Sequence, residues 1–142
     1  LGEGEGATAR WMEQLGEART LVFVGHGPHA ATARQAAMML SEWARVPALG
    51  TGAGAFRHGL IEIVEPGVGV VLFAAPGPGY ASTCALAEEL RGYGATVLIV
   101  EHGHSRAVGE RAPAPLVGDE FLAPLLDIVP VQLFTAALAV AR

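Results

Sequence analysis

Residues 20–28 read TLVFVGHGP, and this stretch decides the fold. The run from Thr20 to Val24 is short, mostly apolar and followed by glycine, which is typical of a buried parallel strand. Pro28 is tolerated in the first turn of a helix, where its missing N–H costs nothing. From there to Arg45, alanine and leucine recur at helical spacing. The stretch therefore predicts a strand, a tight loop and a helix in succession.

The rest of the chain repeats this alternation. Apolar runs predict three further strands, at residues 46–49, 68–75 and 96–100. Helical spacing predicts three further helices, at residues 2–19, 82–93 and 122–140, the last kinked near Pro130. Residues 50–54 are interpreted as a loop, and Leu116-Val117 as a short edge strand. Strands that alternate with helices predict one α/β domain over residues 1–142, a three-layer, doubly wound parallel sheet of flavodoxin-like type.

The composition narrows the function classes. The chain has 142 residues, a formal net charge of −5 and no basic tract, so nucleic acid is not an expected partner. No apolar stretch reaches the ~20 residues that a membrane span needs, because Gly, Pro or a charge interrupts each run. The single cysteine, Cys84, favours a cytoplasmic setting. The chain contains no lysine, so lysine nucleophiles and Schiff bases within it are excluded.

Three loops are expected at the ligand-binding edge of the sheet, because open parallel sheets bind ligands beyond the C-terminal ends of their strands. They cover residues 25–29, 50–59 and 75–80. In the first loop, Gly25 and Gly27 could cradle a phosphate through backbone N–H groups at the start of a helix. The third glycine of a dinucleotide fingerprint is replaced by alanine, and the plainer alternative is a tight turn that glycine permits.

Other side chains near these loops have plainer interpretations. Pro76 and Pro78 remove backbone donors from the third loop, and Ser82 with Thr83 is interpreted as a helix N-cap. Residues 101–104 read EHGH, which is too few ligands for a metal site. Three further side chains are interpreted as packing residues: Trp43, Tyr80 and Cys84. Neither a metal nor a cofactor is therefore expected.

Four segments together resemble the SIS (sugar isomerase) domain family, and within it the second SIS domain of the glucosamine-6-phosphate synthases. They are residues 21–27, 33–42, 54–67 and 124–133. The most specific one reads GAFRHGL around His58 and is followed by IVEPG, a combination that is hard to obtain from packing alone. The resemblance spans nearly the whole chain. It implies one SIS domain that forms the C-terminal lobe of a two-SIS protein.

The resemblance also implies roles for individual residues. Glu42 stands at the position of the family glutamate, which moves a proton between sugar carbons one and two. His58 matches the family histidine, which opens the sugar ring from across a subunit boundary. A carboxylate whose pKa is raised by burial and a histidine near neutrality suit these proton transfers. Four further residues are expected to contact the substrate: Gly25, Gly27, Gln35 and Arg57.

The chain departs from the synthases at several points. Met39 stands where they carry a lysine, and Gln35 where they carry a second glutamate, although residues 35, 39 and 42 share one helix face by their spacing. The lysine-bearing C-terminal tail, the glutaminase domain and the first SIS lobe with its Ser/Thr-rich phosphate loops are missing from this sequence. The chain opens at Leu1 rather than Met and closes at Arg142 inside an apolar helical pattern, so it is expected to be a fragment of a longer protein.

Two hypotheses follow from the resemblance. In the first, the domain is a phosphosugar-binding lobe that forms a homodimer or pairs with a first SIS lobe, so that Glu42 and a neighbour's His58 share a pocket. Any reaction would be aldose–ketose isomerisation or an aminotransferase-related step on an amino-sugar phosphate. In the second, the domain is a catalytically inactive SIS module that binds a sugar phosphate for regulation or only dimerises. Met39, Gln35 and the two prolines of the third loop favour the second hypothesis.

Overall fold

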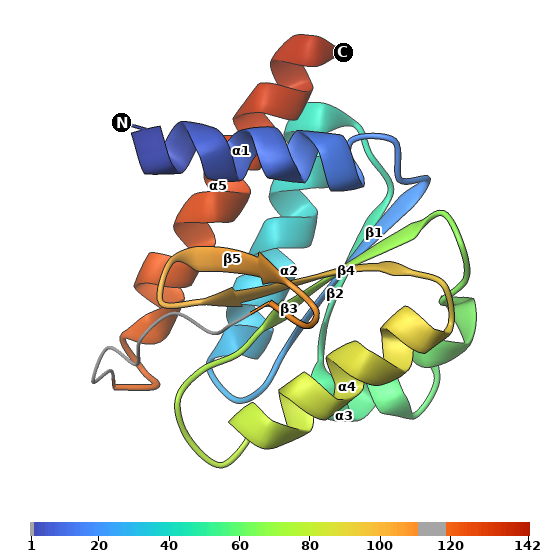
Figure 1. Ribbon diagram of the computed structural model, residues 1–142, viewed down its shortest axis with the longest axis vertical. Helices are drawn as coiled ribbons and strands as arrows, with labels where there is room; N and C mark the ends of the chain where they lie inside the picture. The colour runs from blue at the N-terminus through green and yellow to red at the C-terminus, as the bar shows by residue number, and fades with distance from the viewer. Residues whose placement is uncertain (1, 111–118) are drawn as a thin grey trace.

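A computed structural model describes residues 2–110 and 119–142 of the chain. A five-stranded sheet lies between two layers of helices (Figure 1). The strands are β1 (Thr20–Gly25), β2 (Ala48–Gly52), β3 (Val68–Phe73), β4 (Thr96–Glu101) and β5 (His104–Ala107). The helices are α1 (Gly2–Leu15), α2 (His29–Met39), α3 (Ala53–Arg57), α4 (Tyr80–Gly92) and α5 (Ala123–Ala141), with a π-helical turn η1 (Leu40–Ala44) and a 3-10 turn η2 (Leu60–Ile63).

The strand order is β2-β1-β3-β4-β5, and the first four of these strands are parallel. The predicted fold class, a three-layer, doubly wound α/β sheet, is confirmed. β5 was not predicted from the sequence. It pairs antiparallel with β4 through a tight turn at His102 and Gly103. Both turn residues are left-handed, with φ of 53° and 74°. The predicted edge strand at Leu116-Val117 lies outside the described residues.

The three central strands, β1, β3 and β4, are buried on both faces, because successive side chains along a strand point to opposite sides. One set of side chains, which includes Phe23 and Phe73, packs under α1, α2 and α5. The rings of these two residues are stacked with their centroids 6.4 Å apart. The alternate set, which includes Val22 and Leu72, packs against α3 and α4. The sheet therefore requires a helical layer on each side.

α5 is a core helix of the first layer. The Trp11 ring of α1 lies against Phe134 of α5 with the ring centroids 5.3 Å apart, and both side chains are fully buried. The helix continues through Pro130 as one element. Contrary to the expectation from sequence, α5 is long and apolar enough to cross a membrane, although 39% of that stretch is buried inside the protein. A single helix of this kind is a weak indication of a span, because core helices pass the same test.

β2 begins two residues later than the strand predicted at 46–49, and it takes in residues 50–52, which were expected to form a loop. The backbone N–H of Val46 instead donates to the carbonyl oxygen of Leu40 at 3.4 Å, which keeps Val46 with the end of the preceding helix. Two glycines in residues 50–52 hid the strand from an analysis based on apolar runs. The strand is held by parallel pairing with β1 along its whole length.

The predicted N-cap of α4 is wrong. The helix begins at Tyr80, two residues earlier than expected, and Gly79 is its N-cap residue. Ser82 is exposed, and the hydroxyl of Thr83 donates back to the carbonyl oxygen of Gly79 at 2.9 Å. Thr83 therefore bonds within the first turn of the helix and does not accept from an N–H at its start.

Gly50→Ala should lower the free energy of unfolding by about 2–3 kcal/mol. A Cβ at this position would lie 2.2 Å from the carbonyl oxygen of Ala33, so α2 would have to move away from β2. Gly54 in α3 is the matched control, since a Cβ there has no neighbour within 4 Å. Gly54→Ala should be neutral or stabilising by up to about 1 kcal/mol. Urea unfolding of the two variants measures the difference, and equal stabilities would contradict the close α2–β2 contact.

Candidate functional site

Two loops meet where the direction of chain winding reverses. β1 and β3 are neighbours, but the chain proceeds from β1 to β2 on one side and from β3 to β4 on the other, which is where open α/β sheets bind ligands. The loops after β1 and β3 touch at His26, because a Cβ on Gly79 would lie 3.1 Å from Cγ of the His26 ring. The carboxylate of Glu120 lies beside Gly77 of the same loop. The two prolines of this loop lack backbone N–H donors, and the Glu120 carboxylate beside it is negative. Both features disfavour phosphate binding by this loop.

The two glycines predicted to contact the substrate each have a structural reason to be glycine. Gly25 is buried, and a Cβ there would lie 2.3 Å from the carbonyl oxygen of His29. Gly27 is exposed and left-handed, with φ of 50°. The N–H groups of His29 and Ala30 already donate within this turn, to His26 and Gly27 respectively, at 3.0 Å. Substrate contact by Gly25 and Gly27 stays a prediction.

A buried histidine–aspartate pair lies at the same edge of the sheet, and the sequence analysis missed it. His29 Nε2 and Asp127 Oδ2 are 2.7 Å apart, and both side chains are fully buried. The other carboxylate oxygen, Oδ1, accepts the N–H of Gly103 at 2.6 Å. The His29 ring also stacks on Phe73 at 5.7 Å. The pair therefore joins the start of α2, the N-terminal part of α5 and the β4–β5 turn.

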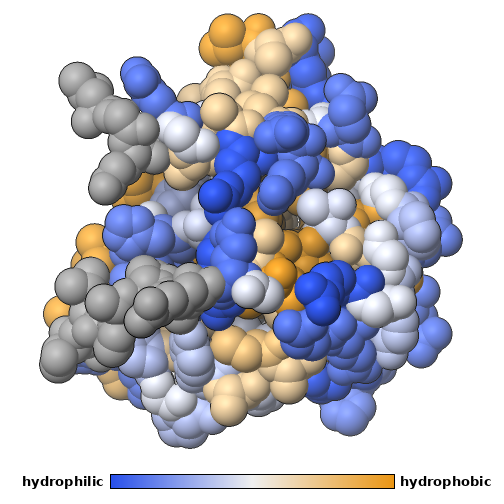
Figure 2. Space-filling view, viewed as in Figure 1, coloured by the Kyte–Doolittle hydropathy of each residue, from blue (hydrophilic) through white to orange (hydrophobic). Residues whose placement is uncertain are grey.

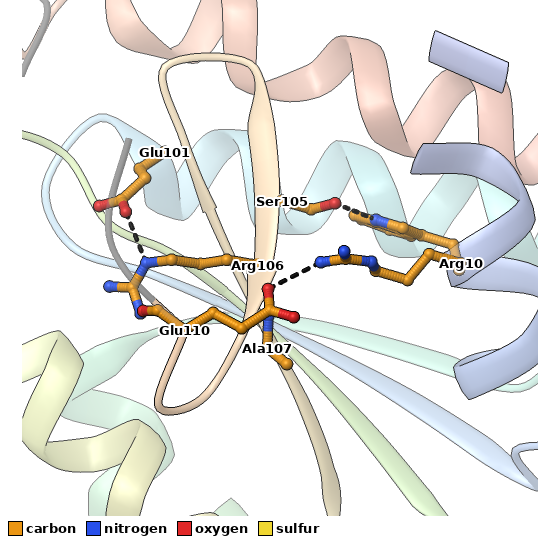
Figure 3. Close-up of polar contacts among 7 residues, drawn as sticks. Arg10, Glu101, Ser105, Arg106, Ala107 and Glu110 are labelled. Atoms are coloured by element: carbon orange, nitrogen blue, oxygen red, sulfur yellow. Dashed lines mark hydrogen bonds and ion pairs between the residues drawn. The ribbon is translucent and has the colours of Figure 1, made fainter. Parts of the chain in front are cut away.

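A second polar cluster surrounds the end of β4 (Figure 3). The carboxylate of Glu101 is buried and accepts the Nε–H of Arg106 at 2.6 Å. Arg106 Nη2 lies 3.7 Å from Sγ of Cys84, which is half-buried. Burial raises the pKa of the Tyr80 phenol, and its hydrogen bond with Glu101 raises it further. Among residues 2–110 and 119–142, no group of three or more His, Cys, Asp or Glu side chains is arranged to hold a metal ion.

β5 is also tied to α1. Figure 3 shows Arg106 extending toward Glu101, whereas Ser105 extends the other way, where its hydroxyl accepts the indole N–H of Trp11 at 2.7 Å. The carboxylate of Glu110 accepts the N–H of Ala107 at 3.0 Å and the guanidinium of Arg10 at 2.7 Å. The Ala107 bond is the main cause of the lowered pKa of Glu110. A cavity of about 420 Å³ opens between α1, the β4–β5 turn and α5.

The two predicted catalytic residues lie at opposite ends of the sheet. Glu42 is in η1, which follows α2 after that helix has run back from the C-terminal ends of the strands. The N–H of Leu21, at the start of β1, donates to Pro47 just beyond η1, which places η1 at the edge where the strands begin. His58 ends α3, which follows the C-terminal end of β2. Figure 1 shows η1 at the top and α3 at the bottom. One copy of the chain does not bring Glu42 and His58 together.

The surroundings of Glu42 differ from the expectation. Glu42 and Gln35 are exposed, but Met39 is only 5% exposed, so the three residues do not form one solvent-facing surface. Met39 packs into the core beneath α2, and the π-helical turn that follows changes the helical register. Trp43, which was interpreted as a packing residue, is 58% exposed beside Glu42. The burial that a proton-transfer carboxylate requires is therefore not supplied within this chain.

Arg57, the remaining predicted substrate contact, lies next to His58 at the end of α3. Its guanidinium pairs with the carboxylate of Glu89 on α4 at 3.1 Å, and the two side chains are 41% and 36% exposed. An exposed pair of this kind contributes little to stability, so the guanidinium can exchange Glu89 for another anion. Contact with substrate by Gln35 and Arg57 stays a prediction.

The comparisons with known proteins agree with one another. The family model described as SIS domain matches residues 14–142. Two relatives share the name glutamine–fructose-6-phosphate aminotransferase (isomerizing). The one from Gloeobacter violaceus is 33% identical over 128 residues, covering 87% of this chain and 21% of the relative. The one from Methanothermobacter thermautotrophicus is 32% identical over 125 residues, covering 84% and 21%. The chain spans about a fifth of the length of these curated relatives.

Solved structures share the fold. The C-terminal domain of glucosamine-fructose-6-phosphate aminotransferase from Francisella tularensis matches with a TM-score of 0.77 at 18% identity, over 98% of this chain and 42% of that one. Tagatose-6-phosphate ketose/aldose isomerase from Escherichia coli matches with a TM-score of 0.77 at 19% identity, over 99% and 42%. At these identities the likeness concerns the fold.

Asp127→Ala should lower the free energy of unfolding by about 3–5 kcal/mol, because it leaves the buried His29 and the half-buried N–H of Gly103 without their acceptor. The matched control is Asp119→Ala. The carboxylate of Asp119 is exposed and accepts the N–H of Phe121 at 2.8 Å, so its loss should cost about 1 kcal/mol or less. Chemical denaturation of both variants measures the two costs. A small loss for Asp127→Ala would mean that the buried pair does not hold the three segments together.

Tyr80 should ionise above pH 10.0 in the folded protein, because burial and Glu101 both raise its pKa. Protonated Tyr80 therefore contributes to the free energy of unfolding. This contribution is complete below the pKa of tyrosine in the unfolded chain, about 10, and is lost as the pH rises through the pKa of Tyr80 in the folded protein. The chain has two tyrosines, so an absorbance titration of the Tyr93→Phe variant reports on Tyr80. Adding Glu101→Gln should lower the midpoint. A midpoint at or below 10.0 before that change would refute the prediction.

Proposed function

The chain belongs to the SIS domain family, and from this premise we propose that it is a phosphosugar-binding lobe of a protein similar to glucosamine-6-phosphate synthase. The proposed reaction is aldose–ketose isomerisation or a related step on an amino-sugar phosphate. The names of its relatives, an isomerizing aminotransferase and a ketose/aldose isomerase, support this substrate class. A cytoplasmic setting is part of the proposal and accords with the single cysteine.

The separation of Glu42 and His58 is the observation that carries the proposal. Both residues match functional positions of the family, both are exposed, and they lie at opposite ends of one sheet. Two residues so placed can serve one substrate only if they come from different copies or lobes. A pocket shared across a subunit boundary accounts for why each is left open to solvent in a single chain.

The proposed chemistry divides the proton transfers between the two residues. Glu42 takes the proton from the carbon next to the carbonyl carbon and returns it to the former carbonyl carbon, while a proton passes from the hydroxyl oxygen of the first carbon to the former carbonyl oxygen. His58 of the neighbouring copy moves the proton of the ring oxygen as the sugar opens. The neighbouring copy must also cover Glu42, because a carboxylate becomes an effective base for such protons when its surroundings exclude water. The exposed Trp43 is an apolar surface beside Glu42 against which that cover can pack.

The loop that follows β3 is not expected to be the main binding site for the phosphate group of the sugar. That loop has two prolines and the Glu120 carboxylate beside it, which are unfavourable to an anion. Arg57 is better suited, because its exposed pair with Glu89 is easily exchanged. We therefore assign the phosphate to a neighbouring lobe or copy, with Arg57 as the contribution of this chain.

A second function, an inactive module that binds sugar phosphate for regulation or dimerises, is favoured by one observation. Met39 occupies the position of the synthase lysine and is buried in the core. A chain without lysine cannot replace that group from elsewhere in its own sequence. The two functions differ in whether substrate turns over.

Mixing two inactive variants tests the shared pocket. Glu42→Gln and His58→Ala should each reduce the interconversion of fructose-6-phosphate and glucose-6-phosphate by about 10²–10⁴-fold. Subunit exchange between equal amounts of the two should restore about a quarter of wild-type activity, because half of the dimers are mixed and each has one intact site. Full turnover by Glu42→Gln would remove it from the mechanism. No recovery on mixing would contradict a pocket shared between copies.

Binding is measured separately by thermal unfolding with fructose-6-phosphate, glucosamine-6-phosphate and inorganic phosphate. The sugar phosphates should raise the apparent stability by about 2.7 kcal/mol at a hundredfold excess over the dissociation constant, and phosphate alone should not. A shift without turnover would favour the regulatory module. No shift with any of the three would contradict sugar-phosphate binding by the chain as it stands.

A further inference from the structure

The cavity of about 420 Å³ between α1, the β4–β5 turn and α5 has the size of a small-molecule site. Three of its lining residues have little or no side chain, which leaves the space between the elements open: Gly6, Ala7 and Gly103. Neither Glu42 nor His58 lines it. The cavity is therefore separate from the two residues of the proposed catalytic site.

The charge of the lining favours an anion. Among the described residues that line the cavity, the ionisable ones are Arg10 and His104, and none is acidic. The chain as a whole has a formal net charge of −5, so a concave surface with basic residues alone differs from the rest of the molecule. Such a surface attracts a negatively charged ligand.

Arg10 and Ser105 supply hydrogen-bond donors at the cavity. The Arg10 guanidinium extends from α1 toward β5, where its Nη1 donates to the Glu110 carboxylate at 2.7 Å (Figure 3). A guanidinium has further donors at Nη2 and Nε, and this exposed pair is easily exchanged. The Ser105 hydroxyl accepts the indole N–H of Trp11 at 2.7 Å, so its own proton can be donated to a ligand. One guanidinium and one hydroxyl suit the two oxygens of a carboxylate.

α5 contributes an apolar wall to the cavity, formed by Val129, Pro130 and Leu133. Val129 and Leu133 are 43% and 45% exposed. They belong to the exposed apolar side of α5, whose C-terminal end forms the apolar surface at the top of Figure 2. An apolar group placed on this wall would remove both side chains from water. The wall therefore favours a ligand with an apolar body over a fully polar anion such as phosphate.

We propose that this cavity binds a small organic carboxylate with an apolar body. The carboxylate lies at Arg10 and Ser105, and the apolar body lies on Val129 and Leu133. The site is built from α1, β5 and α5, whereas Glu42 is in η1 and His58 ends α3. The site and the proposed function can therefore fail separately, and the test below contains no sugar phosphate.

Tryptophan fluorescence with benzoate as the probe tests the proposal. The chain has two tryptophans, so in the Trp43→Phe background the signal comes from Trp11, which lines the cavity. Benzoate should change this fluorescence to saturation. Benzamide has nearly the same shape without the charge, and inorganic phosphate has charge without the apolar body. Both should bind at least about tenfold more weakly, since each lacks one of the two contacts.

Two substitutions locate the site. Arg10→Gln should weaken benzoate binding by about 10–100-fold, as expected when a hydrogen bond to a charged group is lost. The fold should be retained, because the Arg10 pair is exposed. Ala7→Leu should prevent binding by filling the cavity. The matched control is Ala9→Leu, at an exposed position of the same helix that does not line the cavity, and it should bind benzoate like the wild type.

Nuclear magnetic resonance of the unmodified chain locates the ligand even if a variant fails to fold. The amide signals of Gly103 and Ser105 should shift on titration with benzoate. Absence of saturable binding would overturn the proposal, as would equal binding of benzamide or of inorganic phosphate. Unchanged affinity in Arg10→Gln or Ala7→Leu would place the ligand elsewhere and overturn it as well.

Discussion

The central constraint on this protein is that three neighbouring strands, β1, β3 and β4, have no solvent-facing side. Their side chains point alternately up and down into two separate clusters, so each face of the sheet must be covered by helices. Two glycines show how close this cover lies, since a Cβ on Gly25 or on Gly50 would fall within 2.3 Å of a carbonyl oxygen of α2. α2 therefore lies directly on β1 and β2.

The same layering determines where chemistry can occur. A helix that covers a parallel strand must run antiparallel to it, so α2 carries η1 and Glu42 to the far edge of the sheet. β2 then returns the chain to the near edge and delivers His58 there. A single domain of this type cannot close a pocket around both residues. The proposed use of both residues on one substrate therefore requires a second copy or lobe.

The buried polar groups show how the edge of the sheet is held. Asp127 is the one charged residue of α5, and it contacts both His29 and the β4–β5 turn. Glu101 ends β4 and holds Arg106 of the next strand. Each buried carboxylate has partners on different segments, as buried charges require. These contacts join segments that the apolar core alone would not orient.

Much of the fold could be predicted from the sequence, because short apolar runs ending in glycine or proline and helical spacing of alanine and leucine are local signals. The strands beginning at Thr20, Val68 and Thr96 were predicted for this reason, and the GAFRHGL segment identified the family. The start of β2 was displaced and β5 was missed, since the glycines and polar residues of these segments show no apolar pattern. Both segments are strands because they pair with neighbouring strands.

The pairing of His29 with Asp127, across 98 positions of sequence, could not be predicted from local patterns. Neither could the burial of Met39, the exposure of Trp43 and the separation of Glu42 from His58. The sequence by itself determined the three central strands and the long helices, because backbone preference and apolar periodicity act over a few residues. Only the tertiary structure decided which side chains meet and which remain open, because that depends on how the layers pack.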